Sequence, residues 1–498
     1  MKKPSKFACL TLSAFLCVTV LFGCGAPQAT LFEEGMAYAV SEKGTPLPVY
    51  SVTYDVMGGK DVMPIGGFVG PYMSGGSVDG NSMPNFIDEE YFQLMQDAGV
   101  NMFVYMPDRY EAAPGAMKQV LEYGEKYGIG TFMNSLPLEV LIGSRLGTEL
   151  ITPSDIDKEW LYDKIMETSS YLNYKSYLGL WVVDEPFPNN QLKNLKLVMD
   201  ALVDLDVPNV DFYGNICGRW TGLSTFWNTC SPTTFDDYAA EFMEIPFKML
   251  SVTQYPFAEL DRGDAGLTKS LFDDLSVFRK LANDYGVPLW RMMNAGAYFG
   301  NYDINDFPEG YIPLEGEFLF DGNISLAYGA KSIQYYTMFQ FKGDGLTPDG
   351  GYDSQRSGFI GVDGNKTRWY YYGQKLCRQI KAVEHVLMNA ANVGVIAHGS
   401  KAKAMVGSHP GGGLITSDKF RQLTGVSGDD AVIGCFDYLG GTALYVVNYS
   451  RSQKSKTTFS FDDGYCYDVT QRGQSVAVVG KNVTLTLAPG EGALIVLR

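Results

Sequence analysis

Residues 61–391 contain short apolar runs that alternate with longer segments in which apolar residues recur every three or four positions. The short runs predict buried strands, and the periodic segments predict amphipathic helices. The strands are predicted at residues 63–69, 101–106, 130–136, 178–185, 210–215, 248–255, 289–294 and 332–339. The helices are predicted at residues 88–98, 116–127, 157–171, 190–205, 235–243, 270–285, 315–328 and 367–387. This alternation predicts an α/β fold, a (β/α)8 TIM barrel over residues 61–391.

An open, doubly wound sheet would show the same alternation of strands and helices. Such folds usually carry a glycine-rich phosphate-binding turn after the first strand. The stretch 66–70, Gly-Gly-Phe-Val-Gly, lacks the required spacing and has no helix directly behind it. The closed barrel is therefore the expected architecture.

The pattern changes between residues 392 and 498, where short alternating runs are separated by Gly, Asp, Asn and Ser. Such runs predict antiparallel strands. They lie at residues 393–397, 431–437, 442–449, 456–461, 464–469, 483–487 and 492–497. We expect a small all-β sandwich domain that contributes no catalytic group.

Residues 1–23 have the features of a signal peptide, because Lys2, Lys3 and Lys6 precede an apolar run. The run is too short to remain in a membrane as a permanent span. Its end, Leu-Phe-Gly-Cys, resembles the bacterial lipobox, which implies cleavage before Cys24 and lipid on the Cys24 sulfur. An ordinary signal peptide is the alternative. Residues 24–60 then form a tether and an irregular lead-in, and we expect an extracytoplasmic protein anchored to the bacterial membrane or surface by lipid alone.

The charge and composition of the chain exclude several classes of partner and of catalytic site. The formal net charge of −17 argues against nucleic acid as a partner, because no basic footprint is present. The 3 histidines, His385, His398 and His409, all follow the predicted barrel strands, which excludes a histidine triad or a multi-histidine metal site in the barrel. The cysteines show no metal-like spacing. We therefore expect no metal and no cofactor, and carboxylate chemistry remains.

The stretch 178–186, Leu-Gly-Leu-Trp-Val-Val-Asp-Glu-Pro, places two acids at the end of a buried strand. Barrel enzymes keep their catalytic groups at this end of the strands. Pro186 is expected to hold Glu185 extended, and strict alternation then directs Glu185 into the barrel mouth and Asp184 toward the outer helices. Burial and the adjacent charge are expected to raise the pKa of Glu185, as a general acid requires. Alternatively, the two acids cap the next helix or pair with an arginine.

The mature chain resembles a glycoside hydrolase of the clan A type, in which a (β/α)8 barrel precedes a small β-sandwich. Residues 181–186, Trp-Val-Val-Asp-Glu-Pro, resemble the fourth-strand motif, where the acid before Pro is the acid/base. Residues 317–333 resemble the seventh helix and eighth strand, and residues 358–364 resemble the loop before the last helix. The resemblance implies a cell-surface hydrolase that cleaves O-glycosidic bonds of a carbohydrate with Glu185 as general acid/base.

The chain departs from that family at two positions. Asp184 stands where the clan usually has Asn, and the predicted strand 289–294 ends without the nucleophilic Glu that the clan keeps there. Glycoside hydrolysis still requires a second group opposite the acid. Three alternatives remain open for it: Glu315 or Glu317 from the following helix, Asp303 or Asp306 from the preceding loop, or a substrate 2-acetamido group oriented by Asp184. The last resembles the substrate-assisted hexosaminidases.

Polar and aromatic residues at the strand ends are predicted to form a sugar-binding floor. They are Tyr105, Asn215, Gln254, Tyr255, Arg291, Asn294 and Tyr336. Trp220, in the long loop after the fifth strand, is predicted to stack on a sugar ring. For each of them core packing is the alternative.

A different class of function is compatible with the same residues. The missing acid at the end of the seventh strand favours a surface lipoprotein that binds carbohydrate on a hydrolase scaffold without cleaving it. A fold by itself does not establish activity. A carboxylate across the pocket from Glu185 would favour the enzyme.

Overall fold

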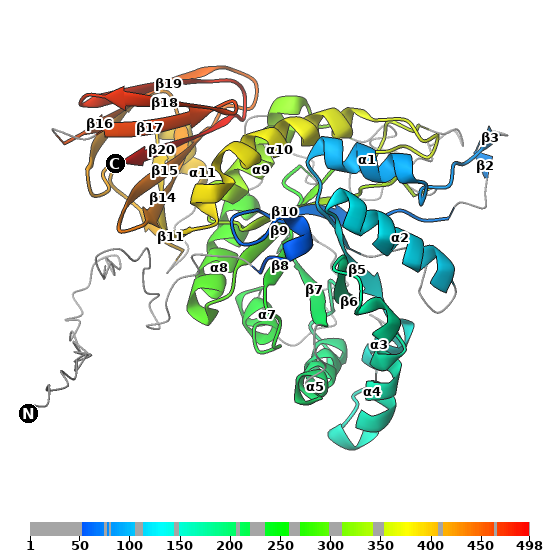
Figure 1. Ribbon diagram of the computed structural model, residues 1–498. Coiled ribbons are helices and arrows are strands. Elements are labelled where there is room, and N and C mark those ends of the chain that lie inside the picture. The colour runs from blue at the N-terminus through cyan, green and yellow to red at the C-terminus, as the bar shows by residue number, and fades with distance from the viewer. Residues whose placement is uncertain are drawn as a thin grey trace, which may run out of the picture.

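The computed structural model describes residues 52–73, 77–78, 81–104, 113–143, 149–205, 210–219, 235–257, 269–297, 311–341, 353–406, 412–462 and 466–497. Eight parallel strands close into a barrel in the order β1-β10-β9-β8-β7-β6-β5-β4. They are β1 (Ile65–Phe68), β4 (Met102–Val104), β5 (Gly130–Asn134), β6 (Tyr177–Asp184), β7 (Asp211–Cys217), β8 (Leu250–Thr253), β9 (Leu289–Asn294) and β10 (Ser332–Tyr336). The predicted barrel is therefore confirmed (Figure 1).

Helices surround the barrel, and most follow the predicted positions. They are α1 (Glu89–Ala98), α2 (Pro114–Tyr127), α3 (Leu136–Ile142), α4 (Lys158–Met166), α5 (Asn190–Asp204), α7 (Phe235–Phe242), α8 (Lys269–Tyr285), α9 (Glu315–Ala327) and α10 (Arg368–Leu387). Short 3-10 turns lie at Asp55–Met57, Pro153–Asp155 and Ser169–Tyr171, and a two-stranded ribbon pairs β2 (Ser77–Val78) with β3 (Asn81–Ser82). Helices α1 and α2 end at Gly99 and Gly128, both with positive φ, as expected for glycine caps. None of the described helices is long and apolar enough to cross a membrane.

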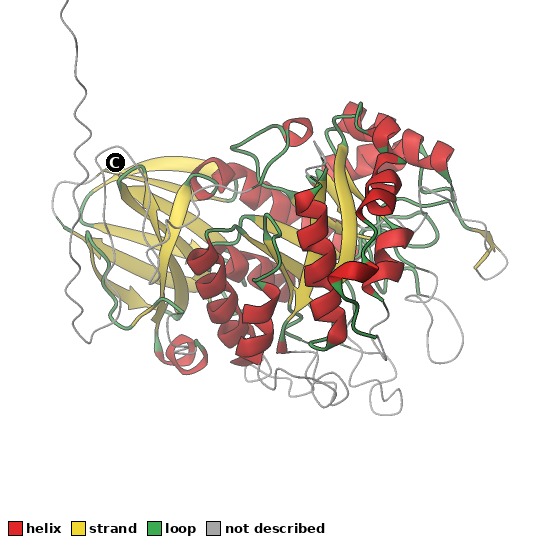
Figure 2. Ribbon diagram, turned by 90° about the horizontal axis from the view of Figure 1, so that it is seen from below, coloured by secondary structure: helices red, strands yellow, loops and turns green. Residues whose placement is uncertain are grey.

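The C-terminal part of the chain is built from β-sheets, as predicted, and their strands pair antiparallel except for the parallel pair of β11 and β12. A seven-stranded sheet has the order β12-β11-β14-β15-β20-β17-β18, and a three-stranded sheet has the order β13-β16-β19. The strands are β11 (Ala390–His398), β12 (Leu414–Ile415), β13 (Leu423–Gly428), β14 (Ala431–Tyr438), β15 (Gly441–Asn448), β16 (Ser455–Phe461), β17 (Cys466–Gln471), β18 (Gln474–Val479), β19 (Asn482–Leu487) and β20 (Gly492–Leu497), and helix α11 (Ser400–Met405) follows β11. The strands of both sheets lie together to one side of the barrel (Figure 2). Side chains such as Ile433, Phe459 and Ile495 form an apolar core between the two sheets.

The other face of the large sheet packs against α9 of the barrel. Val432, Phe436 and Tyr445 belong to the same apolar cluster as the barrel core. A Cβ atom at Gly434 would lie 2.2 Å from the carbonyl oxygen of Ala327, so only glycine permits this approach. The barrel and the sheets therefore share one continuous core.

Buried polar residues fasten the same junction. The Arg279 guanidinium donates from Nη2 to the backbone oxygen of Asn392 at 3.0 Å, and the Lys331 ammonium donates to the backbone oxygens of Leu387 and Ala390. Burial lowers the pKa of Lys331 to about 7. These bonds satisfy backbone carbonyls where α10 ends and β11 begins, which fixes the C-terminal sheets on the barrel.

Candidate active site

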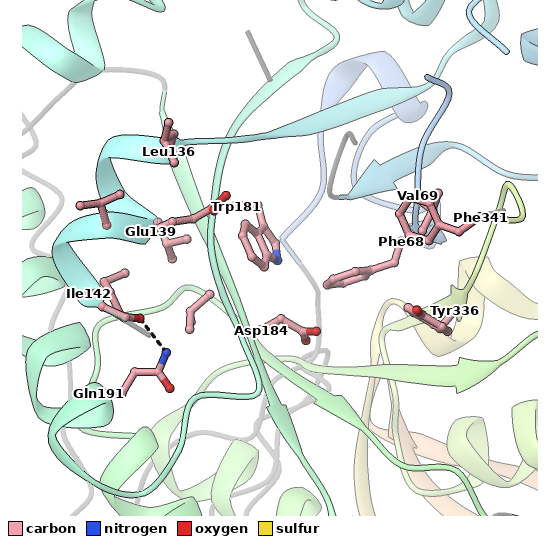
Figure 3. Close-up of a pocket in the computed structure, with 14 residues that line it drawn as sticks. Phe68, Val69, Leu136, Glu139, Ile142, Trp181, Asp184, Gln191, Tyr336 and Phe341 are labelled. Atoms are coloured by element: carbon pink, nitrogen blue, oxygen red, sulfur yellow. Dashed lines mark hydrogen bonds between the residues drawn. The ribbon is translucent and has the colours of Figure 1, made fainter. Parts of the chain in front are cut away.

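A cavity of about 600 Å³ lies at the carboxyl ends of the barrel strands. Its walls come from the ends of β1, β6 and β10, from α3, and from the beginning of α5. They include Phe68, Val69, Leu136, Glu139, Val140, Ile142, Gly143, Trp181, Val182, Val183, Asp184, Gln191, Tyr336 and Phe341 (Figure 3). The size and position match those of substrate sites in barrel enzymes.

The end of β6 does not follow strict alternation. The register between β6 and β7 shifts between Trp181 and Val183, which places an extra residue in β6. Such a bulge reverses which residues face inward. As a result Asp184 lines the cavity, although alternation predicted that it would face the helices. Glu185 follows it directly but is not among the residues that line the cavity.

The backbone of Glu185 also differs from the prediction. Its φ is 46°, in the left-handed region, and β6 ends at Asp184, so the expectation that Pro186 would keep Glu185 extended is wrong. The physical reason is tertiary: the Glu185 N–H donates to the backbone oxygen of Asn215 at 2.8 Å, which fixes the chain after the bulge. A non-glycine residue in this conformation costs about 1–3 kcal/mol, and such strain concentrates at functional sites.

The loop after the acid pair is held on both sides. The Gln191 side chain accepts a hydrogen bond from the Phe187 N–H at 2.9 Å and donates to the backbone oxygen of Gly143 at 3.1 Å. The Tyr238 hydroxyl donates to the backbone oxygen of Pro186 at 2.8 Å. These bonds hold the turn in which Glu185 lies.

Asn215 orients the Asp184 carboxylate. Its Nδ2 donates to Asp184 Oδ1 at 3.0 Å, and the Ser251 hydroxyl donates to Asn215 Oδ1 at 2.9 Å. Asn215 is fully buried, whereas Asp184 is half-buried. Because Ser251 determines which side of the Asn215 amide accepts, the nitrogen is left to face Asp184. Asn215, predicted to bind sugar, thus bonds directly to a carboxylate on the cavity wall.

This hydrogen-bonded chain continues into the barrel interior. The Tyr213 hydroxyl lies 2.6 Å from the Ser251 hydroxyl and donates to Gln334 Oε1 at 2.5 Å. Burial raises the pKa of Tyr213, and the charge of Asp184 raises it further, so the phenol remains a donor. The network gives Asp184 a rigid polar support on strands β7, β8 and β10.

Aromatic side chains form much of the cavity wall. The rings of Phe68 and Trp181 meet edge to face, with centroids 6.4 Å apart, and Phe68 also contacts Tyr213 at 6.1 Å. In Figure 3, Phe68, Tyr336 and Phe341 lie on the side of the cavity toward which Asp184 points. Aromatic faces suit sugar rings, whose C–H groups pack on them.

Sequence reasoning missed one carboxyl group of the cavity. Glu139 lies on α3, a seven-residue helix that was not predicted and that begins at the last residue of the strand predicted at 130–136. In Figure 3 it lines the cavity on the far side of Trp181 from Asp184. Pro137 near the helix start, followed by Leu138, Leu141 and Ile142, carried a signal for a short amphipathic helix.

The two glutamates proposed for the second catalytic role lie elsewhere. Glu315 pairs with Lys375 on α10, and its side chain is 44% exposed. Glu317 accepts from the Leu314 N–H at 2.9 Å and lies 4.0 Å from Arg451. Neither lines the cavity. Both occupy the first turn of α9, where acids complement the helix dipole.

Arg291 and Gln254, predicted to bind sugar, face outward from the barrel strands. Arg291 is fully buried and donates from Nη2 to Asp321 of α9 at 3.0 Å. Gln254 is also fully buried and donates from Nε2 to Asp274 of α8 at 3.2 Å. The structure therefore assigns both to contacts between the barrel and its helices.

Of the remaining predicted residues, some lie within the described part of the chain and others lie outside it. Tyr336 lines the cavity, and its ring centroid lies 6.5 Å from that of Tyr255. Asn294 is half-buried and donates to the backbone oxygen of Gly296 at 3.1 Å. Tyr105, Trp220, Asp303, Asp306 and Cys24 lie outside the described residues. Within the described ranges no group of three or more His, Cys, Asp or Glu side chains is placed to hold a metal ion.

No protein-family model matches the chain, and no curated protein matches it. Among solved structures, it is similar to a protein described as a glycoside hydrolase, with 11% identity, a TM-score of 0.49, and coverage of 93% of this chain and 97% of the other. A glycoside hydrolase family 5 protein from Bacteroides vulgatus ATCC 8482 gives 13% identity, a TM-score of 0.48, and coverage of 94% and 93%. A β-galactosidase from the psychrophilic Marinomonas ef1 gives 12% identity, a TM-score of 0.45, and coverage of 67% of this chain and 63% of the other.

Proposed function

We propose that the protein is a glycoside hydrolase that cleaves O-glycosidic bonds in the barrel cavity, with the acid pair Asp184 and Glu185 as its catalytic groups. The observation that carries the proposal is the placement of Asp184. Its carboxylate lies on an aromatic-walled cavity at the carboxyl end of a barrel strand, and Asn215 holds it at 3.0 Å. Carboxylates in such a position are what glycoside hydrolysis requires.

The two acids are proposed to have different roles. A hydrogen bond from an amide stabilises the charged form of a carboxylate, so Asp184 suits the stabilisation of positive charge at the sugar C1 in the transition state. Glu185 does not itself line the cavity, but it directly follows Asp184 at the cavity wall and is half-buried, so it is the proposed proton donor to the leaving oxygen. The turn that Gln191 and Tyr238 hold keeps this donor in place.

The bulge in β6 supports a substrate-assisted variant of this mechanism. It brings Asp184 to the cavity wall, where a carboxylate can accept a hydrogen bond from the N–H of a substrate 2-acetamido group. The acetamido oxygen would then attack C1 and form a cyclic oxazolinium intermediate, while Glu185 protonates the leaving oxygen. The proposal needs no protein nucleophile, which agrees with Asn294 at the end of β9.

A second candidate function is carbohydrate binding without cleavage. The observation that favours it is the composition of the wall toward which Asp184 points. Phe68, Tyr336 and Phe341 form that wall, and no carboxylate from the described residues accompanies them (Figure 3). An aromatic surface of this kind binds sugar rings but supplies no charged group to the opposite face of a substrate.

We also propose that the protein is held at the outer surface of the bacterial membrane through lipid on Cys24. The order of basic residues, apolar run and Leu-Phe-Gly-Cys supports this location. Two acyl chains on one cysteine suffice for stable anchoring. Replacing Cys24 with Ala should release the protein into the soluble fraction of cells. Unchanged membrane association of the variant would contradict the lipid anchor.

The experiment that tests the enzymatic proposal screens purified protein against aryl glycosides and oligosaccharides, including 2-acetamido sugars. The matched variant is Asp184→Asn with Glu185→Gln, which keeps shape and removes both acids. We expect hydrolysis by the wild type and none above background by the variant. Saturable sugar binding by both proteins, with hydrolysis by neither, would instead establish the binding function.

A further inference from the structure

A second cavity, of about 450 Å³, lies at the junction of the barrel helices and the C-terminal sheets. One wall comes from α9 and α10, through Leu319, Lys375, Arg378 and Gln379. The other wall comes from three turns at one end of the sheets: Lys454 precedes β16, Arg472 joins β17 to β18, and Ala488 and Glu491 join β19 to β20. It shares no lining residue with the cavity that contains Asp184.

This junction cavity has the opposite electrical character from the protein as a whole. Lys375, Arg378, Lys454 and Arg472 contribute four positive charges to its lining, against one carboxylate from Glu491. The whole chain has a formal net charge of −17. Four cations on one concave surface of so acidic a protein create a local field that attracts anions.

Two of the four cations already have a structural partner. Arg472 forms a two-pronged ion pair with Glu491, with distances of 2.7 Å from Nε to Oε1 and 2.9 Å from Nη2 to Oε2. Glu491 is buried and also accepts from the Ala488 N–H at 2.6 Å. Lys375 pairs with Glu315. These contacts hold one arginine and one lysine on opposite walls of the cavity.

The other two cations, Arg378 and Lys454, have no ion-pair partner among the described residues. Among the described residues, neither Arg378 nor Lys454 makes a hydrogen bond or an ion pair, and both are exposed. They come from different walls, since Arg378 is on α10 and Lys454 is in the turn before β16. A ligand between them could therefore receive charged hydrogen bonds from both the barrel and the sheets.

A buried amide adds a fifth donor to the lining. Gln379 is only 7% exposed, and its Oε1 accepts from Asn323 Nδ2 at 3.1 Å. Asn323 also donates to the backbone oxygen of Gly490 and accepts from the Tyr445 hydroxyl at 2.6 Å. With its oxygen fixed in this way, Gln379 Nε2 makes no hydrogen bond with any described residue.

We propose that the junction cavity binds a small ligand that carries oxyanion groups, with Arg378 and Lys454 as the residues that recognise its charge. Arginine and lysine donors match carboxylate, sulfate and phosphate oxygens. None of the described residues that line the cavity is aromatic, so charge and not ring stacking selects the ligand. A volume of about 450 Å³ holds one or two sugar units. The oxyanion can belong to an acidic sugar or to free phosphate or sulfate.

Isothermal titration calorimetry at low ionic strength tests the proposal with four probes: digalacturonate, inorganic phosphate, inorganic sulfate, and maltose as the neutral control. We expect one-site binding of at least one anionic probe and none of maltose, with affinity that falls as salt is added. The anionic probe that binds with the highest affinity shows whether the ligand is an acidic sugar or a free inorganic anion. Absence of saturable binding by all three anionic probes would overturn the proposal.

The matched variants are Arg378→Ala with Lys454→Ala, and Lys118→Ala with Lys456→Ala. Both pairs remove two exposed positive charges, but Lys118 and Lys456 do not line the junction cavity. Because neither Arg378 nor Lys454 makes a hydrogen bond or an ion pair with a described residue, the first variant should fold normally. We expect it to weaken binding by about tenfold or more, because it removes two charged hydrogen-bond donors, whereas the second variant should bind as the wild type does. Equal loss in both variants would show nonspecific attraction and contradict the site.

This inference does not rest on the proposed hydrolase function. The variant with Asp184→Asn and Glu185→Gln should bind the anionic probe with wild-type affinity, because those residues do not line the junction cavity. Failure of hydrolysis would therefore leave the anion site intact, and failure of anion binding would leave the hydrolase proposal intact. Loss of anion binding in that variant would contradict the separate site.

Discussion

Polar residues of the barrel strands face in two opposite directions and have different roles. Inward from the strands, Asp184, Asn215 and Ser251 form a connected network that reaches the cavity. On the outer side, Arg291 pairs with Asp321, fully enclosed between β9 and α9. Sequence position alone would assign both sets to a substrate site. The direction of each side chain decides which set can meet a ligand.

The two sets also differ in how they are paired. The inward network carries one charge, on half-buried Asp184, and its other members are neutral amides and hydroxyls. The outward residues include the buried ion pair of Arg291 and Asp321, and burial raises the pKa of Asp321 to about 6. A substrate site leaves its charge accessible, whereas a structural site encloses each charge with its partner.

The largest effect is expected on the free energy of unfolding, from a change in the outward-facing pair of Arg291 and Asp321. Replacing Arg291 with Met leaves the Asp321 carboxyl buried without its partner, and breaking a buried pair costs about 3–5 kcal/mol. Denaturant unfolding measures this loss. The control is Lys158→Met, which breaks the exposed pair with Asp204 and should cost about 0–1 kcal/mol. If the Arg291→Met protein is as stable as the wild type but has a raised KM, Arg291 binds substrate and the structural role is contradicted.

The next effect is expected on activity, at the inward set. Asp184→Asn keeps an oxygen that can accept from Asn215 but removes the charge. Loss of one group that stabilises transition-state charge costs about 10²–10³ in kcat, so we expect a decrease of that order with unchanged stability. The control is Asp462→Asn, an exposed acid of the C-terminal sheets. If the loss occurs only on 2-acetamido sugars, Asp184 orients the substrate acetamido group.

A smaller effect, on the pH dependence of stability, is expected at Asp274. Burial raises its pKa to about 7 from 3.8, so the folded protein holds a proton there that the unfolded chain releases above pH 3.8. This contribution to stability is therefore present at low pH and is lost as the pH rises to about 7. Asp274→Asn removes the titration, and its stability relative to the wild type should rise by about 1–3 kcal/mol from pH 5 to pH 7. A constant difference in unfolding free energy between the two proteins would contradict the raised pKa.

The fold could be predicted from the sequence because each element carries its own local signal. Residues 289–294 were predicted as a strand and form β9 with the same bounds, and the helix predicted at 190–205 is α5. Strand β18, which was missed, is exposed along most of its length, so no alternation of apolar and polar residues marks it. The short helix α3 was missed because it spans only seven residues.

The site was less predictable because it depends on local irregularity and on tertiary partners. The bulge at Trp181–Val183 is defined by the pairing of β6 with β7, and the residue types of β6 alone do not predict it. The orientation of Asn215 depends on Ser251, which lies 36 positions away in the sequence. Glu315 and Glu317 have the composition of catalytic acids but the partners of helix-end residues. For such residues, the neighbour across space determines the role.

The most direct test of the acid pair compares leaving groups in Glu185→Gln. The substitution keeps the side-chain shape and removes the proton that the leaving oxygen needs. We predict a loss of about 10²–10⁴-fold in kcat on a natural glycoside, and a far smaller loss for bond cleavage of an activated aryl glycoside, whose leaving group departs without protonation. Equal losses on the two substrates would contradict the role of Glu185 as proton donor, and full activity on both would contradict the site.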